Sequence, residues 1–472
     1  MSTSPTSRYG VVNQARLPAT NKRFLQLPTR LIPLILLSQL FDYQLLDLSS
    51  FKVLFSITPD RILFLTLFFI FGCALLQGNV EPRSSSRAEV YLMFLLGFVC
   101  TSSWFISGVD FGSAKYKYLA TLFNFIYFPF GVYISVKSTR YNRAATLTLL
   151  WAIVGLGTYL VVNGIFEHYG VDSLVWPKYI LDPTAGIQFG RLRGPFASSV
   201  PMGEWLIVVV MSAALLTPFA QRGRKLFLYS LILLAMAGIY WTDTREVWVG
   251  FAGVVAIAAA FGRGKMRAQA FTIVLLVLVV FVVGVGSKFS LGQQTLFSRR
   301  QNTVDYRLAN FSTAYKMGMD NFIFGVGYGK FLSKWREYFG PEERKLVSDL
   351  KDGNHNTYLG LFAETGICGL LVYISLLFVL ILKCISKWIH LSPERHFERN
   401  FVLCAFALII VSMNEAMFSD LRNSSPALNV LLFLFLGIVA SIDAGSSEAE
   451  DTGQRFGKAK LYTPVLARNE RV

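Results

Sequence analysis

Long apolar blocks separated by short polar segments dominate the pattern of this 472-residue chain. Each block approaches the roughly 20 residues that a helix needs to cross a bilayer. The pattern therefore predicts an all-α polytopic membrane protein with twelve membrane-spanning helices. These spans are predicted at 31–48, 60–78, 89–107, 116–136, 144–165, 202–220, 226–241, 246–262, 268–287, 357–382, 400–417 and 425–443.

The same blocks divide the chain into parts. These are a tail at 1–29, nine spans in 30–287 with an outer loop at 165–200, a polar segment at 288–356, three spans in 357–444 and a tail at 445–472. Within the polar segment, Leu308, Phe311 and Tyr315 recur on one face of a predicted helix. The segment is too short for an independent enzyme domain, so we expect it to cap the membrane bundle.

Charge orients the bundle. The short loops on one side carry 15 Lys and Arg in 41 residues, against 9 in 72 on the other side. Because positive residues stay in the cytoplasm, both tails are predicted to be cytoplasmic. The net charge of +16 is thereby spread over loops and tails, and no nucleic-acid partner is expected. The five cysteines fall inside apolar blocks and form no disulfide pattern.

Unusual charged residues collect on the predicted outer side. An ionisable group in the hydrocarbon region costs about 2.5–3.5 kcal/mol on insertion scales. Several at one depth therefore indicate a shared hydrated site, although each one alone is equally explained by a structural ion pair. The set comprises Asp42, Asp47, Asp60, Arg61, Arg191, Arg193, Glu204, Asp243, Arg245, Glu246, Arg299, Arg300, Arg307, His355, Glu364 and Glu415.

Three of the arginines stand out by their surroundings. Arg191 and Arg193 lie in FGRLRGPFASSVP, where glycines permit close approach of a ligand to the backbone. Arg245 lies in WTDTREVWVG, a tight turn between two spans. Guanidinium forks match phosphate oxygens, so these residues are candidates to bind an anion. Interfacial anchoring of Arg191 and Arg193, or pairing of Arg245 with Asp243 or Glu246, remain the alternatives.

His355 begins the run HNTYLGLFAETG, where the chain changes from polar to apolar. A neutral imidazole is a good general base near neutral pH, and Asn356 beside it is a candidate supporting residue. The alternative is a helix-capping histidine. Glu364 is nine residues further on, half a turn out of phase on a straight helix, so we expect it to hold a neighbouring element rather than to pair with His355.

Several patterns are absent from the sequence. No His-Glu-x-x-His pattern or cysteine cluster provides a metal site, so no metal or other cofactor is predicted. The run Gly325–Lys330, GVGYGK, lacks the spacing of a phosphate-binding loop. We interpret it as a turn that shapes the outer segment.

Together these stretches resemble the bacterial O-antigen ligase and polysaccharide polymerase family. The resemblance is carried by TDTREVWVG, by YRLANFSTAYKMGMDNFIFGVGYGKF and by HNTYLGLFAETGICGL, and more weakly by GRLRGPFASSVPMGEW, across residues 190–370. The chain departs from the family pattern where no proline precedes Gly325, and where Ser198 and Ser199 replace asparagine and proline.

The resemblance implies a GT-C-like, metal-independent, inverting glycosyltransferase of the bacterial inner membrane with its site facing the periplasm. It would move a glycan from a polyprenyl diphosphate carrier to an acceptor hydroxyl. His355 and Arg245 would be catalytic, Arg191, Arg193 and Arg307 would bind the diphosphate, and Glu364 and Asn356 would support them.

The acceptor separates two versions of this function. The departures from the family pattern favour polymerisation of repeat units of an exported polysaccharide, with a second lipid-linked glycan as acceptor. A ligase would instead deliver the finished glycan to lipid A core or to protein. A transporter or lipid flippase is the alternative from another class, but it predicts polar residues at mid-membrane depth rather than on one side.

Overall fold

The computed structural model describes residues 31–41, 59–76, 87–108, 119, 121–139, 141–275, 295–348, 350, 353–424 and 426–443. Throughout these ranges the regular secondary structure is helical, with no strand. Six of the described helices are long and apolar enough to cross a membrane, and further apolar helices are shorter. The chain is thus a polytopic membrane protein. The predicted tails, residues 42–48 of the first predicted span and residues 276–287 of the ninth lie outside the described ranges.

A helix lies at each predicted span. In chain order these are Leu31–Leu40, α2 (Pro59–Leu76), α3 (Ala88–Ile106), the π-helical turn Phe123–Tyr127 that continues into α5 (Phe128–Lys137), α6 (Arg143–His168), α7 (Ser199–Leu216), α8 (Arg222–Trp241), α9 (Arg245–Phe261), a helix at 265–275, α14 (Thr357–His390), α15 (His396–Phe418) and α17 (Pro426–Ser441). The prediction rests on the length and the apolar composition of each block. A bilayer requires both of a helix that crosses it, so these two properties are enough to locate the helices.

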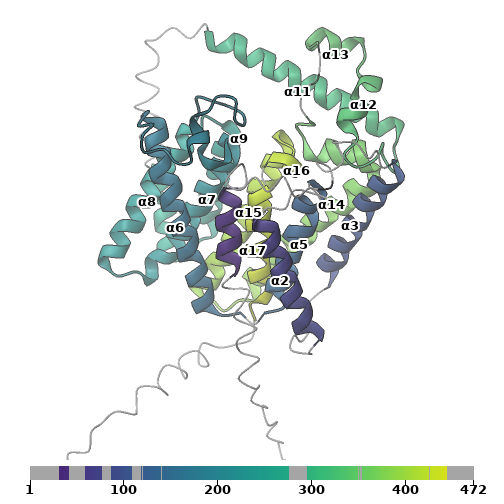
Figure 1. Ribbon diagram of the computed structural model, residues 1–472. Coiled ribbons are helices and arrows are strands. Elements are labelled where there is room, and N and C mark those ends of the chain that lie inside the picture. Colours follow the sequence, from purple (N-terminus) through teal and green to yellow (C-terminus); the bar gives the residue numbers. More distant parts are fainter. Residues whose placement is uncertain are drawn as a thin grey trace, which may run out of the picture.

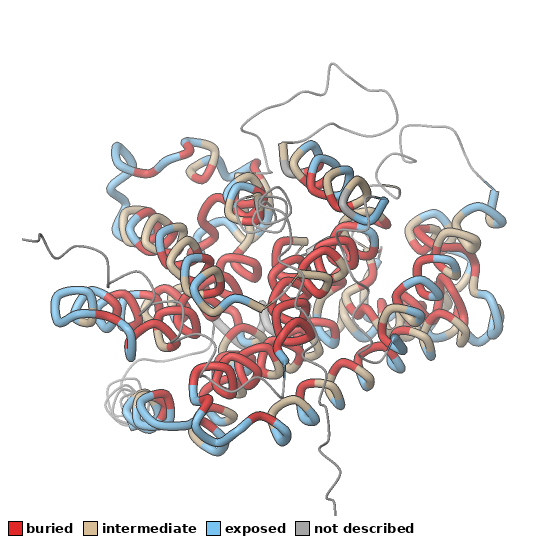
Figure 2. The backbone as a smooth tube through the Cα atoms, turned by 90° about the horizontal axis from the view of Figure 1, so that it is seen from below, coloured by how far each residue is buried: buried red, intermediate tan, exposed pale blue. Residues whose placement is uncertain are grey.

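The centre of the bundle is formed by α7, α15 and α17. Most of their side chains are buried, whereas the helices around them carry exposed residues on their outer sides (Figure 2). Such all-round apolar helices belong in the interior of a bundle. Close approach depends on small residues: a Cβ on Gly157 of α6 would lie 2.3 Å from the Val209 side chain of α7.

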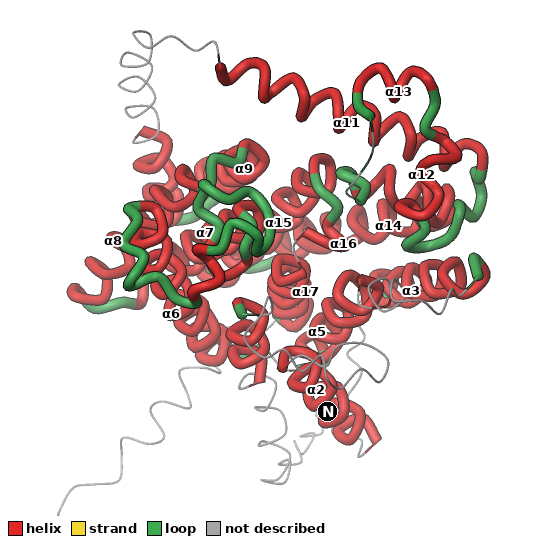
Figure 3. Tube along the Cα trace, turned by 45° about the horizontal axis from the view of Figure 1, so that its top comes forward, coloured by secondary structure: helices red, strands yellow, loops and turns green. Residues whose placement is uncertain are grey.

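Three further helices lie across one end of the bundle, which we call the outer end (Figure 1). These are α11 (Thr295–Asp320), α12 (Phe331–Tyr338) and α13 (Pro341–Leu346). A second hydrophobic cluster, with Met317, Phe331 and Trp335, joins them to α14. The loop 169–198 covers the same end beside α9 (Figure 3). The segment between α9 and α14 thus caps the bundle.

Helix α14 is broken at Gly366, which has a φ of +65°. The break frees backbone groups at membrane depth, where unsatisfied groups are costly. The loop after α11 satisfies them: Val326 N–H donates to the Ala363 carbonyl (2.9 Å), Gly327 N–H to the Glu364 carbonyl (2.9 Å), and Ile367 N–H to the Phe322 carbonyl (2.8 Å). A Cβ on Gly366 would lie 2.3 Å from the Ile323 backbone. Glycine at this position therefore lets the loop replace a turn of the helix.

Candidate functional site

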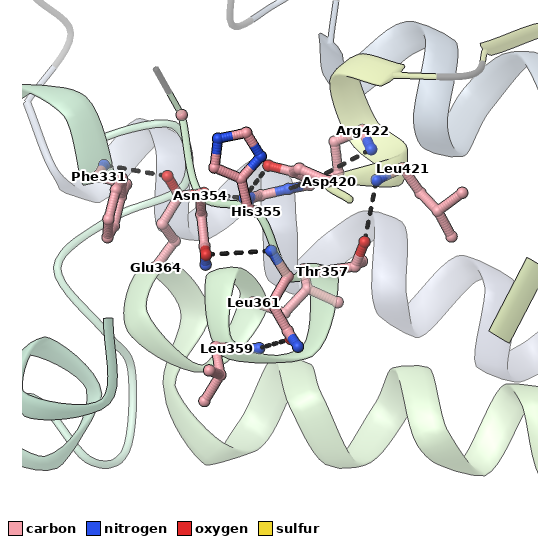
Figure 4. Close-up of polar contacts among 12 residues, drawn as sticks. Phe331, Asn354, His355, Thr357, Leu359, Leu361, Glu364, Asp420, Leu421 and Arg422 are labelled. Atoms are coloured by element: carbon pink, nitrogen blue, oxygen red, sulfur yellow. Dashed lines mark hydrogen bonds and ion pairs between the residues drawn. The ribbon is translucent and has the colours of Figure 1, made fainter. Parts of the chain in front are cut away.

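The start of α14 is held against the end of α15. The Asn356 side chain caps α14 by accepting from Leu359 N–H (2.9 Å), and its Nδ2 donates to the Met417 carbonyl (3.0 Å). The Thr357 hydroxyl donates to the Ser419 carbonyl (3.1 Å) and accepts from Leu421 N–H (2.9 Å), as drawn in part in Figure 4. Asn356 is therefore a cap that fixes the residue before it.

That residue is His355, which is partly exposed. Its backbone N–H donates to Asn310 Oδ1 of α11 (3.4 Å), and its ring meets the Tyr306 ring edge to face, with centroids 5.6 Å apart. Both contacts come from one face of α11. The histidine thus sits between the cap of α14 and the underside of the outer segment.

Arg307, the residue after Tyr306 on α11, interacts with groups at the end of α15 and on α9. Its guanidinium lies 5.9 Å from the Phe418 ring centroid at the end of α15. Glu246 of α9 interacts electrostatically with both Arg307 and Arg191, and the Ser419 hydroxyl donates to its carboxylate (3.2 Å). Two of the arginines predicted from sequence therefore act electrostatically on the same carboxylate, without an ion pair to it within 4 Å among the described residues.

Arg245 precedes Glu246 at the first turn of α9 and is exposed. Among the described residues its side chain has no hydrogen bond or ion pair. The turn before it is fixed to the loop 169–198, because Leu192 N–H donates to the Trp241 carbonyl (3.2 Å) and the Ser199 and Thr244 hydroxyls are 2.8 Å apart. The loop of Arg191 and the turn of Arg245 are therefore one rigid unit.

Arg193 has a different environment from Arg191. Its side chain is buried, and its guanidinium donates to the carbonyls of Ala185 (2.5 Å), Ile180 (2.7 Å) and Asp182 (2.6 Å). The Glu167 carboxylate accepts from the backbone N–H groups of Arg193 (3.1 Å) and Gly194 (2.9 Å). The structure thus places Arg193 inside the loop and leaves Arg191 at its surface.

Glu364 belongs to a buried ionic cluster. Arg422 of α16 (Leu421–Ser424) binds the Asp420 carboxylate through Nε and Nη2, each at 2.7 Å, and donates to Glu364 through Nη1. The other oxygen of Glu364 accepts from Phe331 N–H (3.0 Å), which Figure 4 shows. The guanidinium also lies 5.5 Å from the Tyr328 ring centroid. This cluster fastens α12, α14 and α16 together.

The sequence reasoning did not single out Asp420 or Arg422. The available signal was their position in the short segment SDLRN between two apolar blocks, where every charged residue has to find a partner or a ligand. Their partner Glu364 lies 58 residues earlier, so the pairing itself follows only from the folded chain.

With this geometry in place, the comparison with protein families gives one match. Residues 228–374 match a family model described as O-antigen ligase. The matched stretch runs from α8 through the break in α14 and holds Arg245, Arg307, His355 and Glu364. Arg191 and Arg422 lie outside it. No curated protein matches the chain.

Proposed function

We propose that this chain, whose residues 228–374 form an O-antigen ligase domain, transfers a glycan from a polyprenyl diphosphate carrier to an acceptor hydroxyl. The observation that carries the proposal is that Arg191 of the loop 169–198 and Arg307 of α11 both act electrostatically on Glu246, which follows Arg245 at the start of α9, while Tyr306 beside Arg307 contacts the His355 ring. In this proposal the outer end faces the periplasm, the membrane is the bacterial inner membrane, and the helical bundle is GT-C-like.

The three arginines suit the diphosphate of the donor. Among the described residues the side chains of Arg245, Arg191 and Arg307 have no hydrogen bond or ion pair, and Arg191 and Arg307 both act electrostatically on Glu246. Guanidinium groups left in this state have donors available for phosphate oxygens. Arg193 has used its donors on three carbonyls, so we assign it to the shape of the loop that presents Arg191.

His355 supplies the base in this scheme. Its imidazole takes the proton of the acceptor hydroxyl while that oxygen forms a bond to the anomeric carbon. The bond from the anomeric carbon to the phosphate oxygen breaks, and its electron pair leaves with the diphosphate, whose charge the arginines stabilise. Attack from the side opposite the leaving group inverts the anomeric centre. As proposed, the arginines perform the charge stabilisation, and the step uses no metal ion or other cofactor.

The acceptor that we propose is a second lipid-linked glycan, which makes the reaction a polymerisation of repeat units. The description of the matched family model favours a second candidate, ligation of the finished glycan to lipid A core or protein. Both reactions use the same donor, the same base and the same leaving group. They differ in the glycan that accumulates when the site fails.

The experiment is a strain that carries His355→Ala as its only copy, compared with a strain that carries His390→Ala. His390 is a matched control because it lies at the other end of α14, partnered with Ser386. Both proteins are quantified in membranes, and lipid-linked and exported glycans are resolved by gel and mass spectrometry. We expect His355→Ala alone to accumulate lipid-linked glycan: single repeat units for a polymerase, full-length chains for a ligase.

Two results would contradict the proposal. A wild-type glycan profile in the His355→Ala strain would mean that the histidine is a structural cap. Accumulation of lipid-linked glycan on the cytoplasmic face, out of reach of a glycosidase added to spheroplasts, would instead indicate a flippase.

A further inference from the structure

The turn that replaces a helical segment of α14 exposes three apolar side chains in a row. The exposed fractions are 48% for Phe322, 55% for Ile323 and 74% for Phe324. The backbone of this turn is fixed by hydrogen bonds to Ile367 and Cys368, so the side chains are held outward by a rigid support. We call residues 322–324 the apolar turn.

The position of the apolar turn along α14 gives its depth. Past the break at Gly366 the helix continues to His390, which at 1.5 Å per residue is about 36 Å. That length is close to the roughly 30 Å of a bilayer's hydrocarbon core. The lower part of α14 is therefore the segment that spans the membrane, and the apolar turn lies where the span begins.

A second helix gives the same depth. The Ser103 hydroxyl of α3 donates to the Glu364 carbonyl (3.0 Å) and accepts from Tyr328 N–H (3.0 Å). Just beyond Ser103, Phe105 and Ile106 end α3 with exposed fractions of 68% and 85%. The exposed apolar end of α3 thus lies beside the loop that carries the apolar turn.

The rest of the outer segment is not apolar in this way. Tyr315 and Met319 on α11, at the spacing of one helical face, extend the exposed apolar surface from the turn. By contrast, α12 and α13 expose charged residues, among them Arg336, Glu337, Glu342, Arg344 and Lys345. One side of the cap is therefore suited to water, and the side next to α3 and α14 is suited to lipid.

We propose that the apolar turn inserts into the outer leaflet, at the boundary between phospholipid head groups and acyl chains. Aromatic side chains are enriched at this depth, and an apolar surface buried there is stabilised by its removal from water. The insertion fixes the height of the loop whose Phe331 N–H binds Glu364, and hence of the outer half of α14 that begins after His355. This contact is independent of whether the site transfers a glycan.

The test places a photo-crosslinking residue, p-benzoyl-phenylalanine, at position 324 of the full-length protein. The protein is reconstituted into vesicles of phosphatidylethanolamine and phosphatidylglycerol, irradiated, and analysed by mass spectrometry for phospholipid adducts. Position 106 at the end of α3 is the reference for lipid contact. Position 337, an exposed glutamate on α12, is the matched control in water.

We expect adducts on acyl chains at position 324 at a yield near that of position 106 and about tenfold above that of position 337, as insertion at the boundary requires. A yield at 324 equal to that at 337 would overturn the proposal. Adducts at 324 that form only with added polyprenyl phosphate, and not with phospholipid, would overturn it as well, because the surface would then hold the carrier chain.

Discussion

Charged side chains are paired differently at the two ends of the bundle. At the inner end, the Glu89 carboxylate of α3 binds Lys137 (2.7 Å) and the Tyr133 hydroxyl (2.9 Å) of α5, and Lys383 of α14. Arg399 and Arg395 nearby donate to the carbonyls of Leu391 (2.7 Å) and Asp443 (2.6 Å). At the outer end, Arg193 and Arg422 are equally well satisfied, whereas the side chains of Arg245, Arg191 and Arg307 have no hydrogen bond or ion pair within the part of the chain that the structure describes.

This difference separates charges that complete the fold from charges that are available to a ligand. A charge near a bilayer is expensive unless it is paired, so the inner cluster and the Asp420–Arg422–Glu364 cluster are both explained by structure alone. The exposed arginines are not explained in that way. They lie together with His355, and this is the part of the molecule to which we assign chemistry.

The largest effect is expected from breaking the buried outer cluster with Arg422→Met. The substitution leaves Asp420 and Glu364 as buried carboxylates without a counter-ion, which costs about 3–5 kcal/mol. Thermal unfolding in detergent measures the loss. Arg344→Met on the exposed face of α13 is the control and should stay within about 0.5 kcal/mol of wild type. Equal stability of the two variants would contradict the structural role of the cluster.

Two substitutions, Arg245→Gln and Arg193→Gln, test the difference between the two kinds of arginine. Arg245 has no partner among the described residues, whereas the Arg193 guanidinium donates to three carbonyls. Loss of a group that stabilises developing charge lowers the rate about 10²–10³-fold. We expect that loss for Arg245→Gln, with an unchanged unfolding temperature. Arg193→Gln should instead unfold more easily, because three carbonyls, two of them on buried residues, lose their donor. Transfer rates per folded molecule, beside unfolding curves, separate the two outcomes, and the reverse assignment would refute the distinction.

At the inner end, Glu89→Gln should reduce stability and leave catalysis intact. Two lysines lose their shared carboxylate at a buried site, which costs about 1–3 kcal/mol. The unfolding temperature should fall while transfer per folded molecule stays at the wild-type value. A large loss of turnover in the folded variant would show that the inner end takes part in function.

The smallest effect concerns the attachment of α13 to α11. Burial opposes ionisation of Glu343, but hydrogen bonds from Lys316 and Ser312 (each 2.5 Å) outweigh it and lower its pKa to about 2. This pKa is lower than the 4.5 of an unperturbed glutamate. The stability that ionised Glu343 gives to the contact between α13 and α11 is therefore complete above pH 4.5 and is lost as the pH falls toward 2. The protection of the α13 amides from hydrogen exchange, after correction for the intrinsic pH dependence of exchange, should therefore fall across that range.

In the same measurement, Glu343→Gln should exchange faster at neutral pH and lose the acid dependence. Glu342→Gln is the adjacent control, since that side chain is 75% exposed and pairs only with Lys345 of the same helix. Acid dependence that persists in Glu343→Gln would assign the effect to another group.

The sequence predicted where the described apolar helices lie, six of them long enough to cross a membrane, because apolar length is a local property. It also predicted the helix that contains Leu308 and Tyr315, though not that this face is exposed. Three features depend on contacts between residues far apart in the sequence and could not be predicted from it. They are the break at Gly366, whose backbone groups bond to the loop at 322–327, and the pairing of Glu364 with Arg422. The third is the burial of Arg193 beside an exposed Arg191. Residue type alone does not distinguish a buried arginine from an exposed one two positions away.

The central claim is that the outer-end arginines and His355 form one site with separate tasks. The most direct measurement uses purified protein in lipid nanodiscs, with a polyprenyl diphosphate-linked glycan as donor, and records donor binding and single-turnover transfer for wild type and His355→Ala. We predict an unchanged Kd for the donor and a transfer rate about 10²–10⁴-fold lower, the usual contribution of a general base. Transfer at the wild-type rate would contradict the claim.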